Sequence, residues 1–144
     1  MILYLDTSVL VKRYVMEAYS GALDSLWSEA EVVAVSEVGY AEAVAAFARK
    51  FRERHISRRV LNSLIRDFKA DWKALLHVIV SDDVNDKCEA LILKHGLRGF
   101  DAIHLASAAI LKKRLKEDVL FCCADQRLLE AADKEKFHVF PANS

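Results

Sequence analysis

The stretch ILYLDTS at residues 2–8 sets four apolar residues directly before an acid and two hydroxyl residues. A short apolar run closed by polar, helix-starting residues is typical of a buried strand that runs into a loop or a helix. Further apolar runs follow at residues 32–35, 77–80, 119–123 and, more weakly, 138–140. Segments with helical spacing stand between these runs, so strands and helices alternate along the chain.

This alternation predicts an α/β fold: a three-layer α/β/α sandwich with a central, mostly parallel sheet. Parallel neighbours need crossover helices, and the strands are continuous apolar runs rather than alternating ones. Helices are expected at residues 9–14, 20–29, 58–75, 101–114 and 126–132, after Ser36, and from about Ser81 to Lys94. A chain of 144 residues has room for one core of normal size, so residues 1–144 are expected to form a single domain with a helical hairpin at about 37–75.

Composition narrows the class of protein without naming a function. The chain is 53% hydrophobic and 29% charged, with 4 Gly and 1 Pro, which is typical of a folded globular protein. No apolar run reaches the roughly 20 residues of a membrane-spanning helix, and the first residues lack a basic leader, so a cytoplasmic protein is expected. The 21 basic and 21 acidic residues cancel, so binding to nucleic acid would need a local basic patch.

Acids stand at positions where an open parallel sheet places its ligand site, outside the carboxyl ends of its strands. Asp6 directly follows the first strand, and Asp125 comes two residues after the fourth. Glu42 lies about one turn into the helix after the second strand, beside Ala41 and Ala45 on a face expected to be apolar, where an unpaired carboxylate is costly. The fourth acid, Asp101, is expected to begin a helix.

A divalent metal ion would reconcile these four carboxylates in one pocket, because they would otherwise repel one another and raise their pKa values. Hard oxygen ligands without a His or Cys cluster favour Mg²⁺ or Mn²⁺, and such a site suits phosphodiester hydrolysis. Taken singly, each acid is also explained as a helix cap, a turn residue or, for Glu42, half of an exposed ion pair with Arg49 or Lys50. Spacing alone leaves both interpretations open.

Four segments resemble the PIN-domain family, especially VapC-type toxins: residues 5–12, 36–46 around Glu42, 97–106 and 124–128. The most specific element is the DAIHLA stretch that begins at Asp101. The resemblance spans nearly the whole chain and implies a three-layer sandwich, Mg²⁺- or Mn²⁺-dependent endoribonuclease activity on an RNA substrate, and neutralisation by a cognate antitoxin. It also implies a homodimer.

The resemblance assigns roles to positions of this chain. Asp6 and Asp101 would be the principal metal ligands, Glu42 and Asp125 would complete the acidic pocket, and Ser8 would orient water or phosphate. His104 is expected to be a buried structural histidine, outside the catalytic set. One departure is Cys123, where the family commonly has Thr or Ser; a thiol is a poorer hydrogen-bond partner, which puts the orientation of Asp125 in doubt.

Two groups of cations are candidate substrate contacts. Arg13, with Lys12, stands two turns from Asp6 and is predicted to contact the scissile phosphate. The second group surrounds the tip of the expected hairpin and serves either as a phosphate track or as a solvated helix end: Arg49, Lys50, Arg52, Arg54, Arg58 and Arg59. The aromatic residues of that hairpin are expected to pack in its interior: Phe47, Phe51, Phe68 and Trp72.

Other functions share parts of this pattern. A haloacid-dehalogenase-type hydrolase needs a second Asp two residues after the first, where Ser8 stands. A receiver-like signalling module needs a paired acid near the first strand and a Lys after a late strand, and Asp6 is followed by Thr7. A catalytically silent PIN-fold module that binds RNA or protein, and a housekeeping RNA-processing PIN nuclease, remain open as alternatives.

Overall fold

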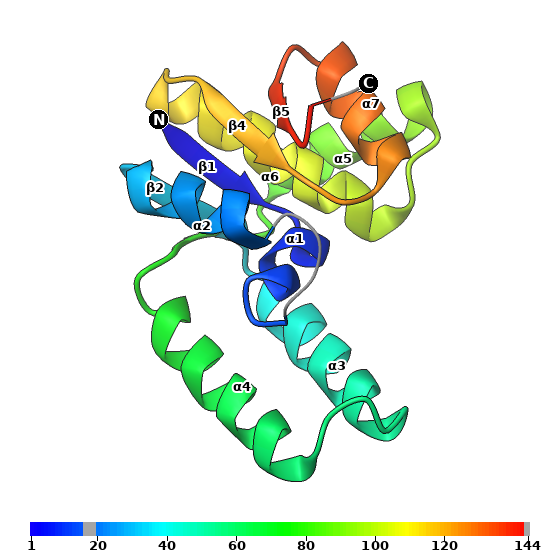
Figure 1. Ribbon diagram of the computed structural model, residues 1–144. Coiled ribbons are helices and arrows are strands. Elements are labelled where there is room, and N and C mark those ends of the chain that lie inside the picture. Colours follow the sequence, from blue (N-terminus) through cyan, green and yellow to red (C-terminus); the bar gives the residue numbers. More distant parts are fainter. Residues whose placement is uncertain (16–19, 143–144) are drawn as a thin grey trace.

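A computed structural model of the chain describes residues 1–15 and 20–142. Its centre is a five-stranded sheet in the order β3-β2-β1-β4-β5, in which every neighbouring pair is parallel (Figure 1). The strands are β1 (Ile2–Leu5), β2 (Val32–Ser36), β3 (Leu76–Val78), β4 (Val119–Cys122) and β5 (His138–Phe140). The sheet is therefore wholly parallel, with the first strand at its centre.

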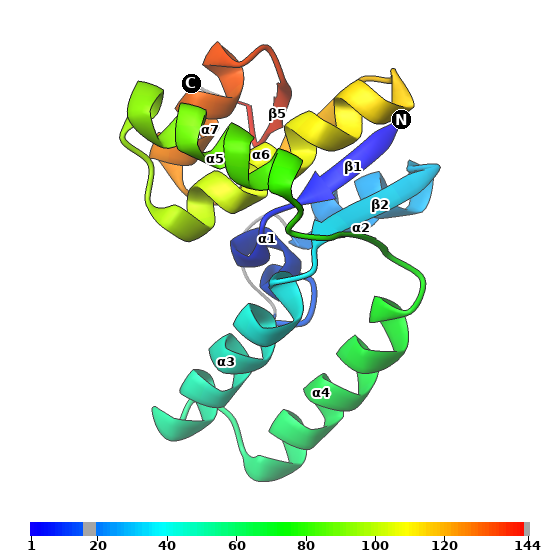
Figure 2. The same cartoon turned by 180° about the vertical axis from the view of Figure 1, so that it is seen from behind.

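Helices connect the strands and cover both faces of the sheet, which confirms the predicted three-layer architecture (Figures 1 and 2). Among the described residues they are α1 (Thr7–Lys12), α2 (Ser20–Glu29), α3 (Gly39–Arg52), α4 (Arg58–Trp72), α5 (Asp82–His95), α6 (Gly99–Leu115) and α7 (Gln126–Lys134). None of these helices is long and apolar enough to cross a membrane. The expected cytoplasmic location stays a prediction.

Several element ends differ from the predicted ones, for local reasons. Helix α4 ends at Trp72 rather than at residue 75, because the ring of His77 stacks on Trp72 and its Nε2 lies 2.7 Å from the Trp72 carbonyl oxygen. Strand β3 ends at Val78, because the next free N–H, that of Val80, donates to the Glu37 carboxylate instead of to a strand. Helix α6 begins at Gly99, so Asp101 lies in its first turn.

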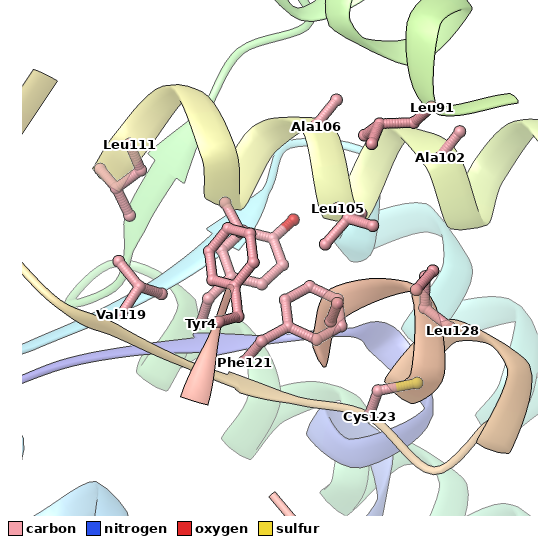
Figure 3. Close-up of a cluster of buried hydrophobic side chains, with 14 of the residues drawn as sticks. Tyr4, Leu91, Ala102, Leu105, Ala106, Leu111, Val119, Phe121, Cys123 and Leu128 are labelled. Carbon is pink, nitrogen blue, oxygen red and sulfur yellow. The ribbon is translucent and has the colours of Figure 1, made fainter. Parts of the chain in front are cut away.

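Two hydrophobic cores lie on opposite faces of the sheet because side chains alternate along each strand. In β1, Ile2 and Tyr4 face the core under α5, α6 and α7, whereas Leu3 and Leu5 face the core under α1 to α4. The first core is shown in Figure 3, where Tyr4 and Phe121 stack at the centre of the cluster. All four residues of β1 are fully buried, as their continuous apolar run requires.

Helices α3 and α4 pack against each other and project from the rest of the molecule as a hairpin (Figures 1 and 2). The predicted buried face of α3 is wrong for its alanines: Ala41 and Ala45 are exposed, and Gly39 and Ala43 are buried instead. Phe47 is buried, as predicted. The alanines are small enough to be tolerated at the surface, and Phe47 carries most of the apolar area, so the helix turns Phe47 inward against Tyr14 and Phe68.

Glu135, at the end of α7, connects that helix to α5. Its carboxylate accepts hydrogen bonds from Lys94 Nζ at 2.7 Å and His95 Nε2 at 2.8 Å, and Lys87 Nζ lies 3.8 Å away. Burial alone would raise the pKa of Glu135, but the hydrogen bonds from Lys94 and His95 and the lysine charges outweigh it, so the pKa is lowered. The folded state therefore favours the charged carboxylate.

We expect Glu135→Gln to lower the free energy of unfolding by about 1 to 3 kcal/mol at neutral pH, the usual range for hydrogen bonds to a charged group. Since the folded pKa lies below the ordinary value of 4.5, this stabilisation is present above pH 4.5 and is lost as the pH falls through the lowered pKa. Urea unfolding of both proteins across that range measures it. Glu89→Gln, at an exposed position of α5, is the control, and a difference that persists unchanged at acid pH would contradict the prediction.

Candidate active site

The carboxyl ends of β1 and β4 place two predicted acids side by side in the fold. The strands are neighbours, with Leu5 opposite Cys122, and the backbone N–H of Asp6 donates to the Cys122 carbonyl at 2.9 Å. Asp6 is thus the last residue held by the sheet and also the N-cap of α1. Asp6 is only 6% exposed, which is unusual for an acid and requires partners.

Ser8 supplies the partners of Asp6. Its hydroxyl donates to Asp6 Oδ2 at 2.5 Å, and its backbone N–H donates to the same oxygen at 3.2 Å. The Ser8 hydroxyl in turn accepts the N–H of Ala124 at 3.1 Å, so it joins the exit of β1 to the exit of β4. The structure therefore places Ser8 in the site, where it orients Asp6; its predicted contact with water or phosphate stays a prediction.

Glu42, in the first turn of α3, reaches this region through two hydrogen bonds to the same oxygen. Thr7 Oγ1 donates to Glu42 Oε1 at 2.7 Å, and His104 Nε2 donates to it at 2.8 Å. Burial alone would raise the pKa of Glu42, but these two bonds outweigh it, so its pKa is lowered and the carboxylate is charged at neutral pH. The half-buried Glu42 is thus held by α1 and α6, and the alternative of an exposed pair with Arg49 or Lys50 is not what the structure shows.

His104 is the centre of this network and is 1% exposed. Its Nδ1 lies 3.1 Å from the Tyr4 hydroxyl, and its Nε2 lies 3.5 Å from Asp6 Oδ1 as well as beside Glu42. A carboxylate can only accept, so Nε2 carries a proton. Burial lowers the pKa of His104, but the Glu42 hydrogen bond and the charges of Asp6, Glu42 and Asp101 outweigh it and raise the pKa above its ordinary value.

Asp125 is fixed by the backbone of α7, of which it is the N-cap. Its Oδ1 accepts the N–H of Arg127 at 2.8 Å and that of Leu128 at 3.2 Å. The Asp125 N–H donates to Cys123 Sγ at 3.1 Å, and Figure 3 shows that sulfur at the edge of the buried cluster. The thiol thus anchors the backbone of Asp125, and the helix cap orients its carboxylate. Asp125 is therefore held in place although Cys123 stands where the family commonly has Thr or Ser.

Asp101 differs from the other three acids. It lies half-buried in the first turn of α6, and its carboxylate has no hydrogen bond or ion pair with any described residue. Burial and the negative charges of Asp6 and Asp125 raise its pKa. Asp101 is therefore close enough to those two acids to be repelled by them, and the positive charges of His104 and Arg98 only partly offset this repulsion.

The oxygens of these four carboxylates are the candidate ligands for a cation. Asp6, Glu42 and Asp125 each have one oxygen anchored by two donors, while the second oxygen accepts no hydrogen bond from a described residue. The second oxygen of Asp6 lies 3.5 Å from His104 Nε2. Oxygen donors with unrelieved repulsion suit Mg²⁺ or Mn²⁺. Among residues 1–15 and 20–142, no three His, Cys, Asp or Glu side chains stand in the geometry of a metal site.

Comparisons with known proteins identify the family. The family model for the PIN domain matches residues 3–134. The chain belongs to the PIN-domain family. Ribonuclease VapC49 of Mycobacterium tuberculosis is 33% identical to it over 107 residues, 74% of each chain. FitAcB from Neisseria gonorrhoeae has a similar fold, with a TM-score of 0.66 and 20% identity over 97% of this chain and 96% of the other. A toxin–antitoxin complex from Klebsiella pneumoniae contains another, with a TM-score of 0.58 and 16% identity over 82% and 83%.

Arg13 does not join the acids of this PIN domain. Its guanidinium pairs with Asp71 at 3.3 Å and Asp24 at 3.6 Å and lies 4.2 Å from the ring centre of Trp27. Two turns along a helix bring residues to the same side, but α1 ends at Lys12, and Arg13 turns toward α2 and α4. The prediction that Arg13 contacts the scissile phosphate is therefore not supported by its placement, and it packs these helices together instead.

Sequence reasoning missed Thr7, Tyr4 and the role of His104 in this PIN domain. His104 was expected to face an apolar side of its helix; it is buried with hydrogen-bond partners as expected, but two of those partners are site acids. Its spacing carried a usable signal, because it stands three residues after Asp101 and therefore on the same side of α6. Nothing in the sequence indicated that Tyr4, inside an apolar strand, would hold the other ring nitrogen.

Proposed function

We propose that this PIN domain is a metal-dependent endoribonuclease that hydrolyses RNA phosphodiester bonds with Mg²⁺ or Mn²⁺ bound among Asp6, Glu42, Asp101 and Asp125. One observation supports the proposal: three carboxylates each have one oxygen fixed by two donors and a second oxygen that accepts no hydrogen bond from a described residue, and the fourth, Asp101, has no hydrogen bond or ion pair with a described residue. Carboxylates fixed in this way cannot relax away from one another, so they conserve a site for a cation.

The residues of the chain prepare this site for a phosphodiester. A bound divalent ion would supply charge neutralisation of the phosphate and activation of an attacking water. Ser8 and the N-terminus of α7 keep Asp6 and Asp125 facing the same edge of the sheet. Thr7 and His104 fix Glu42 from the opposite side, so its open oxygen is oriented before substrate arrives. Fixed donors lose little entropy on reaching the reactive geometry.

The names of related proteins support RNA as the substrate and an antitoxin as the partner. The relative at 33% identity is named a ribonuclease, and one protein of similar fold was solved in a toxin–antitoxin complex. We therefore propose that the chain is the toxin of such a pair. Homodimer formation, expected from the family resemblance, stays a prediction.

Cleavage of a circular single-stranded RNA tests the proposal, because a circle has no ends and only an endonuclease can open it. The purified full-length protein is expected to linearise the circle in Mg²⁺ or Mn²⁺, to lose this activity in EDTA and to regain it when excess Mn²⁺ is added. Cleavage that continues in EDTA would contradict the metal dependence. An intact circle in both metals would contradict the endonuclease.

A further inference from the structure

The end of the α3–α4 hairpin holds the largest group of cations in the sequence. Residues 49–59 contain six cations and a single acid, Glu53, and the remainder of the chain has fifteen cations against twenty acids. Although the chain has no net charge, positive charge is concentrated at residues 49–59 and the remainder of the chain is net negative. We name these six cations the basic tip: Arg49, Lys50, Arg52, Arg54, Arg58 and Arg59.

The five arginines of the basic tip are not neutralised by ion pairs among the described residues. All five of its arginines are exposed, and none pairs with an acid in the described part of the chain. Arg58 lies 4.8 Å from the ring centre of Phe51, and the one local acid, Glu53, is 3.8 Å from His55. Ion pairs among the described residues therefore do not explain these five arginines.

Helix α3 connects the basic tip to the acidic site. Glu42 lies in its first turn, and Arg49 follows seven residues later, two turns along the same face and about 10 Å farther along the axis. Exposed Ala45 lies between them and adds neither bulk nor charge. In Figures 1 and 2, α3 runs from beside α1 to the far end of the hairpin. A polyanion lying along this face would reach both ends.

We propose that the basic tip binds the sugar–phosphate backbone of single-stranded RNA a few nucleotides away from the bond cleaved at the acidic site. The identity of the polyanion rests on the proposed function. Arginine suits phosphate because its planar group donates two parallel hydrogen bonds. An acidic protein fits less well, since protein interfaces have an apolar centre and Val60 is the one large apolar side chain strongly exposed among residues 49–60.

Two positions form a matched pair for the test. Arg54 and Lys116 are both cations with left-handed backbone conformations at helix ends, with φ of 62° and 54°. Glycine adopts this conformation without steric cost, so Arg54→Gly and Lys116→Gly each remove one charge without disturbing the fold. Only Arg54 belongs to the basic tip, because Lys116 ends α6 on another part of the molecule.

Binding of a fluorescein-labelled single-stranded RNA is measured over a series of salt concentrations in an Asp101→Asn background and in EDTA, where cleavage is expected to be negligible. Each phosphate contact contributes about 0.7 to the slope of log affinity against log salt. We expect Arg54→Gly to reduce this slope by about 0.7 and Arg52→Ala/Arg54→Gly/Arg59→Ala by about 2, with at least a tenfold loss of affinity for the triple variant. Lys116→Gly is expected to bind as the background protein does, with melting temperatures unchanged or higher for both glycine variants.

Equal weakening by Arg54→Gly and Lys116→Gly, or an unchanged slope in the triple variant, would overturn the inference. Retained RNA binding together with lost binding to an acidic protein partner would assign the basic tip to that partner instead. The experiments distinguish failure of this inference from failure of the proposed nuclease function. A protein that cleaves RNA with metal but binds equally well without the basic tip refutes only this inference, and one that binds RNA at the tip without cleaving it refutes only the nuclease.

Discussion

Replacing Asp101 by Asn is expected to lower RNA cleavage at saturating Mg²⁺ by about 100-fold or more, because metal-ion stabilisation of a transition state is worth several kcal/mol and each 1.4 kcal/mol is tenfold. The same change should leave the melting temperature of the metal-free protein unchanged or higher. The pKa of Asp101 is raised by burial and by repulsion from Asp6 and Asp125, so the folded protein disfavours its charged form. Asparagine removes that charge and keeps the shape.

Asp86→Asn is the matched control for this variant, since Asp86 is exposed on α5 and far along the chain from the site acids. Cleavage by Asp86→Asn should equal that of the unmodified protein. Initial rates on the circular RNA and thermal unfolding in EDTA measure both effects. If Asp101→Asn cleaves at the normal rate, or if it loses activity only because it unfolds, Asp101 is not a ligand of the ion.

The second large effect is expected at His104. Replacing it by Ala removes a donor to the half-buried Glu42 and the partner of the fully buried Tyr4 hydroxyl. A buried polar group that loses its hydrogen-bond partner costs about 1 to 3 kcal/mol. We therefore expect the free energy of unfolding to fall by about 2 to 4 kcal/mol. Because Glu42 also loses its fixed orientation, the rate of cleavage should fall about 10- to 100-fold, the range for a residue that orients a metal ligand.

A conservative variant of His104 distinguishes a purely structural role of this residue from a role in positioning Glu42. Glutamine at position 104 can still donate from its amide toward Glu42, so His104→Gln should recover part of kcat relative to His104→Ala, with KM for RNA unchanged in both. Tyr4→Phe keeps the imidazole and should reduce activity less than His104→Ala. If kcat is equal in the two His104 variants while their stabilities differ, His104 serves only the fold.

The fold could be predicted from the sequence because its strands are continuous apolar runs. Ile2 and Leu3 face different cores, so a buried central strand has no polar face, and that pattern is local in sequence. The ends of elements depend instead on contacts that are distant along the chain. The ring of His77 ends α4, and Glu37 takes the N–H of Val80 away from the sheet. Propensity and periodicity do not contain these contacts.

The acids of the site could be proposed because strand ends meet at one edge of a parallel sheet, which is a property of topology. Their orientation could not, because it depends on particular donors. Thr7 and His104 are 97 residues apart and meet at one oxygen of Glu42. The predicted phosphate contact of Arg13 is not supported for a related reason. Spacing along α1 predicts the direction of a side chain only as far as the helix continues. Beyond the end of α1, Arg13 contacts aromatic and acidic residues of α2 and α4.

Calorimetric titration of the metal-free protein with Mn²⁺ measures the central claim, that Asp6, Glu42, Asp101 and Asp125 offer their open oxygens to one divalent ion. Saturable binding is expected for the unmodified protein and for Asp86→Asn, with at least about a tenfold weaker affinity in Asp101→Asn. Binding that is absent from the unmodified protein, or equally strong in Asp101→Asn, would contradict the account.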